Sequence, residues 1–314
     1  MKLLTKSKYL KVARSLAYNR VKGEAIYPFY ASFKVTWRCN FRCEFCDVWR
    51  RRTDDLATGD VKRILDDLAS SSVVLVSFEG GEPLLREDIG QILEYASRLP
   101  IYILFTTSER ELESYPMERY CRYIDFLHIS IDEGHRNLEM FDRLEDLAGL
   151  GSELCVQTVV RREDIGSLEP KVRACHRAGA KILIMPAVHL DGTRDHFPDP
   201  GEFRDVCFRL KKRYPGTIIT PDGYLRKFSN PGGCTTDSII IDSDGWLFYP
   251  CRVMGNKAVN LLGTPLEEFL RSERAAECRD MMRRCRRRCG WYQYFATSCY
   301  VSPSGFLAAM RPYL

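Results

Sequence analysis

Short apolar runs alternate with longer amphipathic segments along the first two thirds of the chain. The apolar runs are rich in β-branched residues and predict strands over residues 32–37, 73–78, 101–106, 125–131, 153–160 and 181–185. The segments between them carry apolar residues three and four positions apart, which is typical of helices. These helices are expected near residues 60–70, 87–98, 110–121, 136–149 and 163–178. The alternation predicts an α/β fold, a partial (β/α)6 barrel, because the closed form needs eight units.

The pattern changes after Pro186, where loops rich in Pro, Gly and Asp replace the regular alternation. Further on, the apolar runs SIIID and WLFYPC flank Ser243-Asp244-Gly245 and predict a β-hairpin. We therefore expect a basic helical segment over residues 1–29, a core barrel over 30–200, and a small cysteine-rich hairpin and helix extension over 201–314.

Composition narrows the class of protein. The 314 residues are 45% hydrophobic, enough for one large core and a small appendage. No window approaches the ~18 apolar residues of a membrane-spanning helix, and the N-terminus lacks the features of a signal peptide. We therefore expect a cytoplasmic protein whose 13 cysteines are more often metal ligands than disulfides. Only three Gln and six Asn occur, which favours a thermophilic source.

Cys39, Cys43 and Cys46 directly follow the first predicted strand, at the end of a sheet where barrel enzymes place their chemistry. Thiolates are the usual ligands of iron-sulfur clusters, and three of them leave one iron of a four-iron cluster open to a small molecule. A zinc site without its fourth ligand, a redox dithiol or three buried thiols are the alternatives, but the full C-x3-C-x2-C spacing is rare by chance.

With Phe45 between the last two cysteines, this loop resembles that of the radical S-adenosylmethionine (SAM) superfamily, which binds a four-iron four-sulfur (4Fe-4S) cluster. The second predicted strand ends in Gly80-Gly81-Glu82-Pro83, which is similar to the family's GGEP motif. The resemblance implies that Gly80 and Gly81 let the backbone approach SAM and that Glu82 receives its amino group. It also implies that Ser130 contacts the ribose.

The resemblance extends to the fifth strand and to the reaction. Gln157 and Thr158 match the fifth strand of the family, which lines the cofactor site. For Ser130 and Thr158, an ordinary strand residue with a satisfied hydroxyl is an equally good interpretation. The implied reaction is reductive cleavage of SAM, with an electron from a donor such as ferredoxin or flavodoxin. The resulting 5'-deoxyadenosyl radical would abstract a substrate hydrogen.

A second group of cysteines lies in the last third of the chain. Cys234 and Cys251 bracket the predicted hairpin, and Cys285 and Cys289 stand four apart. This region resembles the SPASM or shorter twitch extensions of radical SAM enzymes, although five residues, not the usual four, separate Gly245 from Cys251. The resemblance implies a second, auxiliary 4Fe-4S cluster on these four cysteines, with Cys299 in reserve and zinc as the alternative metal. We expect Cys121, Cys155, Cys175 and Cys207 to be buried thiols.

Positive charge gathers in two segments. Residues 1–23 hold seven Lys or Arg and no acid, with Leu3, Leu10, Ala13, Ala17 and Val21 at helical spacings. They predict either a helix peripheral to an anionic membrane or a helix packed over the barrel bottom. The run RRCRRR at 283–288 is surface charge beside a cluster, or a phosphate or polyanion site. No nucleic-acid motif accompanies it, so a nucleic-acid partner is not expected.

Three functions remain open. The basic segments favour a radical SAM oxidoreductase or transferase of lipid biosynthesis that forms carbon-carbon bonds on a membrane lipid or isoprenoid. The twitch-like extension favours radical modification of a ribosomal peptide or protein. A non-catalytic iron-sulfur electron carrier is the third, and it would not need a GGEP motif beside the cysteine loop.

Overall fold

A computed structural model describes residues 3–51, 54–230 and 232–301 of the chain. Within these ranges nine strands form one curved sheet in the order β6-β5-β4-β3-β2-β1-β7-β8-β9. The strands are β1 (Tyr30–Thr36), β2 (Leu75–Gly80), β3 (Tyr102–Thr107), β4 (Phe126–Ser130), β5 (Glu153–Val160), β6 (Lys181–Pro186), β7 (Ser238–Ile241), β8 (Trp246–Phe248) and β9 (Lys257–Asn260). The six predicted strands all form, each within two residues of its expected ends.

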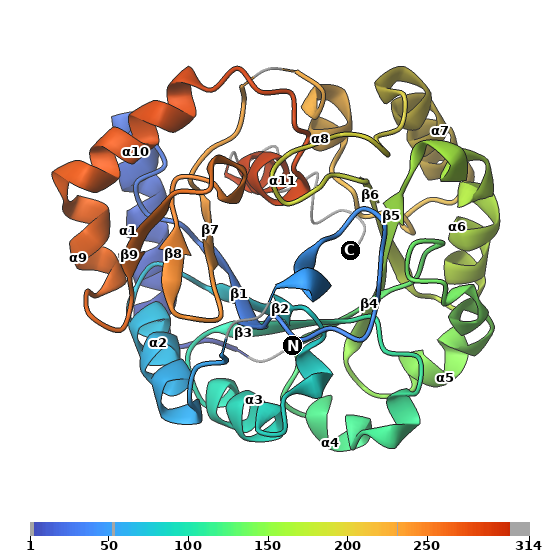
Figure 1. The fold of residues 1–314 in the computed structure, drawn as a ribbon, viewed down its shortest axis with the longest axis horizontal. Helices are drawn as coiled ribbons and strands as arrows, with labels where there is room; N and C mark the ends of the chain where they lie inside the picture. Colours follow the sequence, from blue (N-terminus) through green and yellow to red (C-terminus); the bar gives the residue numbers. More distant parts are fainter. Residues whose placement is uncertain (1–2, 52–53, 231, 302–314) are drawn as a thin grey trace.

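Strands β1 to β6 are parallel and stand side by side in chain order. Their helices run along the outside of the curve, and the segment after β1 crosses its middle (Figure 1). The sheet ends at β6 and β9 without closing, so the predicted partial barrel is confirmed. The helices are α1 (Lys6–Lys22), α2 (Thr58–Ser70), α3 (Ile89–Ser97), α4 (Met117–Tyr120), α5 (Leu144–Ala148), α6 (Leu168–Arg177), α7 (Pro200–Arg213), α8 (Asp222–Lys227), α9 (Leu266–Arg271), α10 (Glu273–Arg284) and α11 (Tyr292–Tyr300).

The main core lies between the outer face of the sheet and these helices. Phe33, Phe78 and Phe105 come from three neighbouring strands and are fully buried in one apolar cluster with Ile64 and Leu68 of α2. Burying a side chain of this size contributes roughly 1.5–3 kcal/mol. Because side chains alternate along a strand, the residues directly before and after each of these phenylalanines face the inside of the barrel.

The prediction of a helix over 110–121 is wrong for most of that range. A 3-10 turn covers Leu112–Ser114, and α4 keeps only four residues. Pro116 precedes α4 and has no backbone N–H to continue a helix from the preceding turn.

The helices predicted over 136–149 and 163–178 are also shorter than expected. Each begins as a 3-10 turn, Leu138–Arg143 before α5 and Arg162–Ser167 before α6. In the first, the Asn137 side chain donates to the carbonyl of Ser130 at 2.8 Å and accepts from the Asp132 N–H at 3.2 Å. Such side-chain bonds to the backbone compete with helical ones.

The predicted hairpin is present, and it continues the barrel sheet. Strand β7 pairs with β8 in antiparallel fashion through a turn at Gly245, whose φ is 82°. Strand β7 also pairs in parallel with β1, with Phe33 opposite Ile241. The C-terminal extension is therefore hydrogen-bonded to the first strand of the barrel.

Helix α1 lies against the N-terminal ends of the strands. The Lys8 ammonium is buried and donates to the carbonyls of Ala69 and Ser71, both at 2.8 Å, just before β2. The Asn19 side chain donates to the Tyr27 carbonyl at 2.8 Å, just before β1. Among the described residues, no helix has the length and apolar character needed to cross a membrane.

Candidate functional site

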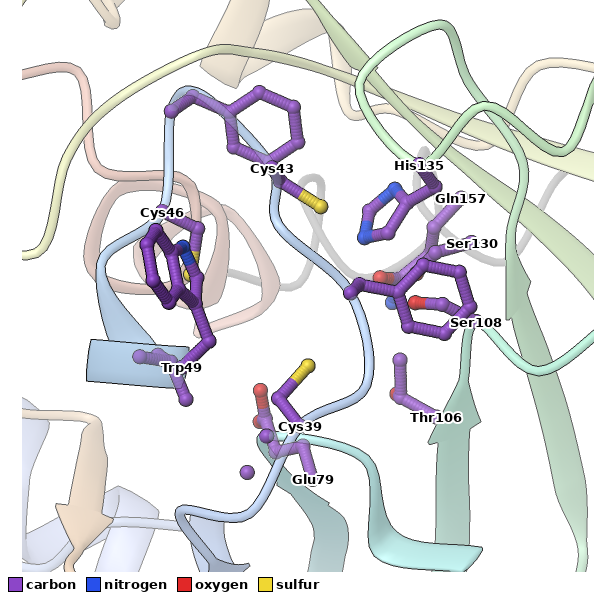
Figure 2. Close-up of a pocket in the computed structure, with 15 residues that line it drawn as sticks. Cys39, Cys43, Cys46, Trp49, Glu79, Thr106, Ser108, Ser130, His135 and Gln157 are labelled. Carbon is purple, nitrogen blue, oxygen red and sulfur yellow. The ribbon is translucent and has the colours of Figure 1, made fainter. Parts of the chain in front are cut away.

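A pocket opens at the C-terminal ends of β1 to β5 (Figure 2). Cys39, Cys43 and Cys46 line it from the loop after β1, and Gly80 and Gly81 line it from the end of β2. The predicted cysteine loop and glycine pair therefore share one pocket.

The three thiols lie close enough to influence one another. Burial is the main reason that the pKa of Cys39 is raised to about 12 and that of Cys46 to about 11. Negative charge contributes to both values, from Glu82, Cys46 and Cys43 at Cys39 and from Cys43 and Asp47 at Cys46. Figure 2 shows the sulfur atoms of Cys39 and Cys43 directed into the same space. Since metal ligands must be thiolates, this group needs a cation between the sulfurs. The donor set therefore fits an iron-sulfur cluster.

Phe45 fixes the cysteine loop against the loop after β4. Its side chain is 7% exposed, and a Cβ on Gly134 would lie 2.1 Å from its ring. The ring also packs edge-on against His135, with 5.7 Å between centroids. Phe45 lines the pocket as well as supporting it.

Gly80 and Gly81 are needed for a close approach of two backbone segments. A Cβ on Gly80 would lie 2.2 Å from the Thr36 carbonyl oxygen, and one on Gly81 would lie 2.0 Å from that of Arg38. The close approach lets the Gly81 N–H donate a hydrogen bond to the Thr36 carbonyl oxygen at 2.7 Å. The glycines therefore seat the end of β2 against the start of the cysteine loop.

Glu82 holds the loops beside the pocket together. Its side chain is 1% exposed and does not line the pocket. The carboxylate accepts hydrogen bonds from the Thr107 hydroxyl (2.8 Å), the Ser108 N–H (2.8 Å) and the Leu84 N–H (3.1 Å). Burial raises its pKa to about 7. These contacts let Glu82 fix the loops around the pocket, and its expected contact with the SAM amino group stays a prediction.

Ser130 and Gln157 line the pocket, whereas Thr158 does not. Gln157 Nε2 lies 2.7 Å from His128 Nδ1, inside the barrel. Burial lowers the pKa of His128 to about 4, so its ring is neutral near pH 7. Thr158 is fully buried, and its hydroxyl has no hydrogen-bond partner among the described residues.

His135 lines the pocket and was not expected from the sequence. Its Nδ1 lies 2.8 Å from an oxygen of the buried Asp132. Burial acts to lower the pKa of His135, but the Asp132 charge outweighs it and raises the pKa to about 10. The Asp-x-x-His spacing is the signal that could have identified this pair.

Lys34 and Glu79 form an ion pair on the inner wall of the barrel and were also missed. Their charged atoms are 2.7 Å apart, with side chains 12% and 25% exposed. Burial acts to raise the pKa of Glu79, but Lys34 and hydrogen bonds lower it below the ordinary value. Glu79 lines the pocket, so this part of its wall is charged.

Cys234, Cys251, Cys285 and Cys289 come together on the C-terminal side. Burial is the main cause of the raised pKa of Cys234, and the other three cysteines raise it further. Cys251 behaves alike, with a pKa raised to about 12 by burial and then by Cys289 and Cys285. Four thiolates are the number of protein ligands that a 4Fe-4S cluster or a structural zinc ion takes.

The remaining cysteines lie elsewhere. Cys299 is half-buried near Gly223, and the charges that affect its pKa do not include the four grouped thiols. Cys278 is buried and accepts a hydrogen bond from Asn256. The four expected to be buried thiols are all buried: Cys121, Cys155, Cys175 and Cys207.

The arginine run at 283–288 makes several contacts within the protein. Arg283 pairs with Glu24 and Asp280, and Arg284 pairs with Asp280. Arg287 donates to the Val253 carbonyl at 2.9 Å, beside the grouped cysteines. These contacts favour surface charge over a phosphate or polyanion site.

The sequence profile of the Radical SAM superfamily matches residues 33–199. Among curated proteins, the PqqA peptide cyclase of Granulibacter bethesdensis is 27% identical over 224 residues, covering 62% of this chain and 59% of the relative. Mycofactocin maturase MftC of Mycobacterium tuberculosis is 26% identical over 173 residues, covering 50% of this chain and 44% of the relative. The matched region thus spans roughly half the length of these relatives.

Two solved structures share the fold. Streptococcus suis SuiB bound to its precursor peptide SuiA gives a TM-score of 0.68 at 16% identity, covering 97% of this chain and 80% of SuiB. The protein anSMEcpe with bound SAM gives 0.65 at 15% identity, covering 91% and 94%. At these identities the likeness concerns the fold alone.

Proposed function

The chain belongs to the radical SAM superfamily, and we propose that it uses radical chemistry to modify a ribosomally made peptide. The superfamily employs a 4Fe-4S cluster and SAM. When bound, this pair supplies reductive cleavage of SAM and a 5'-deoxyadenosyl radical that abstracts a hydrogen atom from the substrate. The observation that carries the proposal is the convergence of Cys39, Cys43 and Cys46 with the Gly80-Gly81 backbone on one pocket.

Each part of the pocket has a role in this proposal. The three thiolates hold the cluster and leave one iron open to SAM. Gly80 and Gly81 present backbone at the pocket wall, and Ser130 and Gln157 offer a hydroxyl and an amide there. Glu82 and Phe45 keep the two loops in place.

The second group of cysteines supports an auxiliary cluster. Cys234, Cys251, Cys285 and Cys289 would hold it, because four thiolates satisfy a 4Fe-4S cluster without an open iron. A low-potential donor such as ferredoxin or flavodoxin would reduce the enzyme.

The comparisons support a peptide substrate. The curated relatives are named as a peptide cyclase and a maturase, and SuiB was solved with its precursor peptide.

A membrane lipid or isoprenoid is the second candidate substrate. The exposed apolar and basic side chains of α1 indicate contact with a membrane, although α1 lies at the end of the barrel opposite the pocket. Comparing peptide and lipid extracts from cells with and without the gene would distinguish the two.

The reaction itself is tested with reconstituted protein. Anaerobically reconstituted enzyme should form 5'-deoxyadenosine from SAM with dithionite, and Cys43→Ala should form none. Cys299→Ala is the matched control, since its thiol lies outside both cysteine groups. Equal product from wild type and Cys43→Ala would refute the assignment. If neither protein forms product, a non-catalytic electron carrier is the remaining function.

A further inference from the structure

Exposed apolar side chains concentrate on the segment that runs from Leu3 through α1. The described residues expose eight large hydrophobic side chains, and five of them lie between residues 3 and 21. These five are Leu3, Tyr9, Leu10, Tyr18 and Val21. Leu3 is 92% exposed and Val21 is 85% exposed, so the described parts of the chain leave them uncovered. Concentration of exposed apolar side chains on one element is typical of an interaction surface.

The apolar residues form one stripe along the helix. Leu10, Ala13, Ala17 and Val21 are spaced by three, four and four positions, which places them on one face, and all four are exposed. The opposite face holds the helix to the protein through the buried polar residues Lys8 and Asn19. The inward face also carries the half-buried Val12 and Leu16, so apolar side chains lie on both faces of the helix.

Basic residues share and border this face: Lys6 and Arg14 each lie four positions from Leu10, and Arg20 lies beside Val21. Lys6, Arg14 and Arg20 are exposed, and among the described residues no carboxylate lies within ion-pair distance of them. The helix contains no Asp or Glu. A partner for this face must offer both apolar surface and negative charge.

We propose that this outward face of α1 docks onto the surface of an anionic lipid bilayer. Apolar side chains enter the boundary between headgroups and acyl chains, while Lys6, Arg14 and Arg20 reach the anionic headgroups. Tyr9 and Tyr18 flank the stripe, and tyrosines favour this interfacial depth. A symmetric contact with a second copy would instead oppose two positively charged helices.

The position of α1 defines how the protein would lie on the bilayer. The helix contacts Ala69 and Ser71 before β2, and the Tyr9 hydroxyl lies 2.9 Å from that of Tyr102 at the start of β3. The pocket opens at the other ends of these strands. Docking through α1 therefore turns the pocket away from the bilayer, so the proposal does not depend on a lipid being the substrate.

The test is flotation of the full-length protein with vesicles. The probes are phosphatidylcholine vesicles and vesicles with about 30% phosphatidylglycerol in phosphatidylcholine. Wild type should bind the anionic vesicles at least tenfold more tightly, and the binding should weaken as salt rises. The variants Leu10→Ser/Val21→Ser and Arg14→Glu/Arg20→Glu should each weaken binding roughly tenfold or more. All four residues are exposed, so both variants should keep the wild-type circular dichroism spectrum.

The matched control is Leu138→Ser/Met281→Ser, which removes two exposed apolar side chains from other surfaces. It should bind like wild type. The proposal is overturned if Leu10→Ser/Val21→Ser binds as well as wild type, or if neutral and anionic vesicles bind equally. It is also overturned if wild type sediments as a dimer that Leu10→Ser/Val21→Ser converts to monomer, since the face would then join two copies.

Discussion

The carboxylate of Glu82 accepts a hydrogen bond from the hydroxyl of Thr107 at 2.8 Å, and this contact joins the ends of β2 and β3 beside the pocket. Two backbone N–H groups, of Leu84 and Ser108, donate to the same carboxylate. The carboxylate that the resemblance assigns to the SAM amino group therefore also holds the ends of these two strands together.

This relationship predicts that Glu82→Ala destabilises the fold. The change leaves buried donors without an acceptor, which costs about 2–4 kcal/mol, and it should lower both the melting temperature and the affinity for SAM. Thr107→Val removes one donor and should lower the melting temperature by less, with SAM affinity retained. Calorimetry and equilibrium SAM binding measure the two effects. An unchanged melting temperature with lost SAM affinity in Glu82→Ala would instead make the carboxylate a direct ligand.

Gly81→Ala should disrupt the cysteine loop. The new Cβ would lie 2.0 Å from the Arg38 carbonyl oxygen, so one of the two backbone segments must move. We expect less iron bound at the pocket and loss of 5'-deoxyadenosine formation. Gly59→Ala is the control, because a Cβ there meets nothing within 4 Å. Full iron content in Gly81→Ala would show that the loop tolerates the shift.

Iron content should report two independent sites. Two 4Fe-4S clusters give about eight irons per chain. Replacing Cys39, Cys43 and Cys46 together by Ala should leave about half of the iron, as should replacing the four grouped C-terminal cysteines. Cys299→Ala should retain all of it. No iron in the first variant, with one equivalent of zinc, would instead support a zinc site on the C-terminal side.

The lowered pKa of His128 predicts that the folded protein loses stability in mild acid. Burial lowers its pKa to about 4 from an ordinary value of 6.5, so the folded protein binds fewer protons than the unfolded chain between these values. The stability associated with neutral His128 is complete above pH 6.5 and is lost as pH falls toward 4, by an amount on the order of 3 kcal/mol.

The measurement is the free energy of unfolding as a function of pH. His128→Gln should be less stable than wild type at pH 7, by about 1 kcal/mol for the altered contact with Gln157. The difference should shrink and then reverse as pH falls below 6. A constant difference across this range would show that His128 keeps an ordinary pKa in the fold.

The sequence by itself determined the parts of this protein that are local in the chain. The short apolar runs identified β1 to β6, because the pattern that predicts a strand lies in consecutive residues. The cysteine loop and the glycine pair were also found in this way, since each motif spans only a few positions. The four C-terminal cysteines were chosen from the resemblance to SPASM and twitch extensions, and their role as cluster ligands stays a prediction.

The tertiary structure alone decided which distant residues meet. Residues 33 and 241 are paired in the sheet, and no local pattern predicts that β7 extends the barrel at β1. Lys34, Glu79 and His135 joined the site only because parallel strands bring their ends to one place. Their residue types are common on any surface, so sequence could not assign them.

The direction in which side chains face was equally a matter of tertiary packing. Helix α1 carries an apolar stripe that would normally be assigned to the core, yet Lys8 and Asn19 hold the helix to the barrel and Leu10 and Val21 face outward. Periodicity shows that a helix has two unlike faces. The buried face is decided by the carbonyls and side chains that it contacts, and these belong to segments far away in the chain.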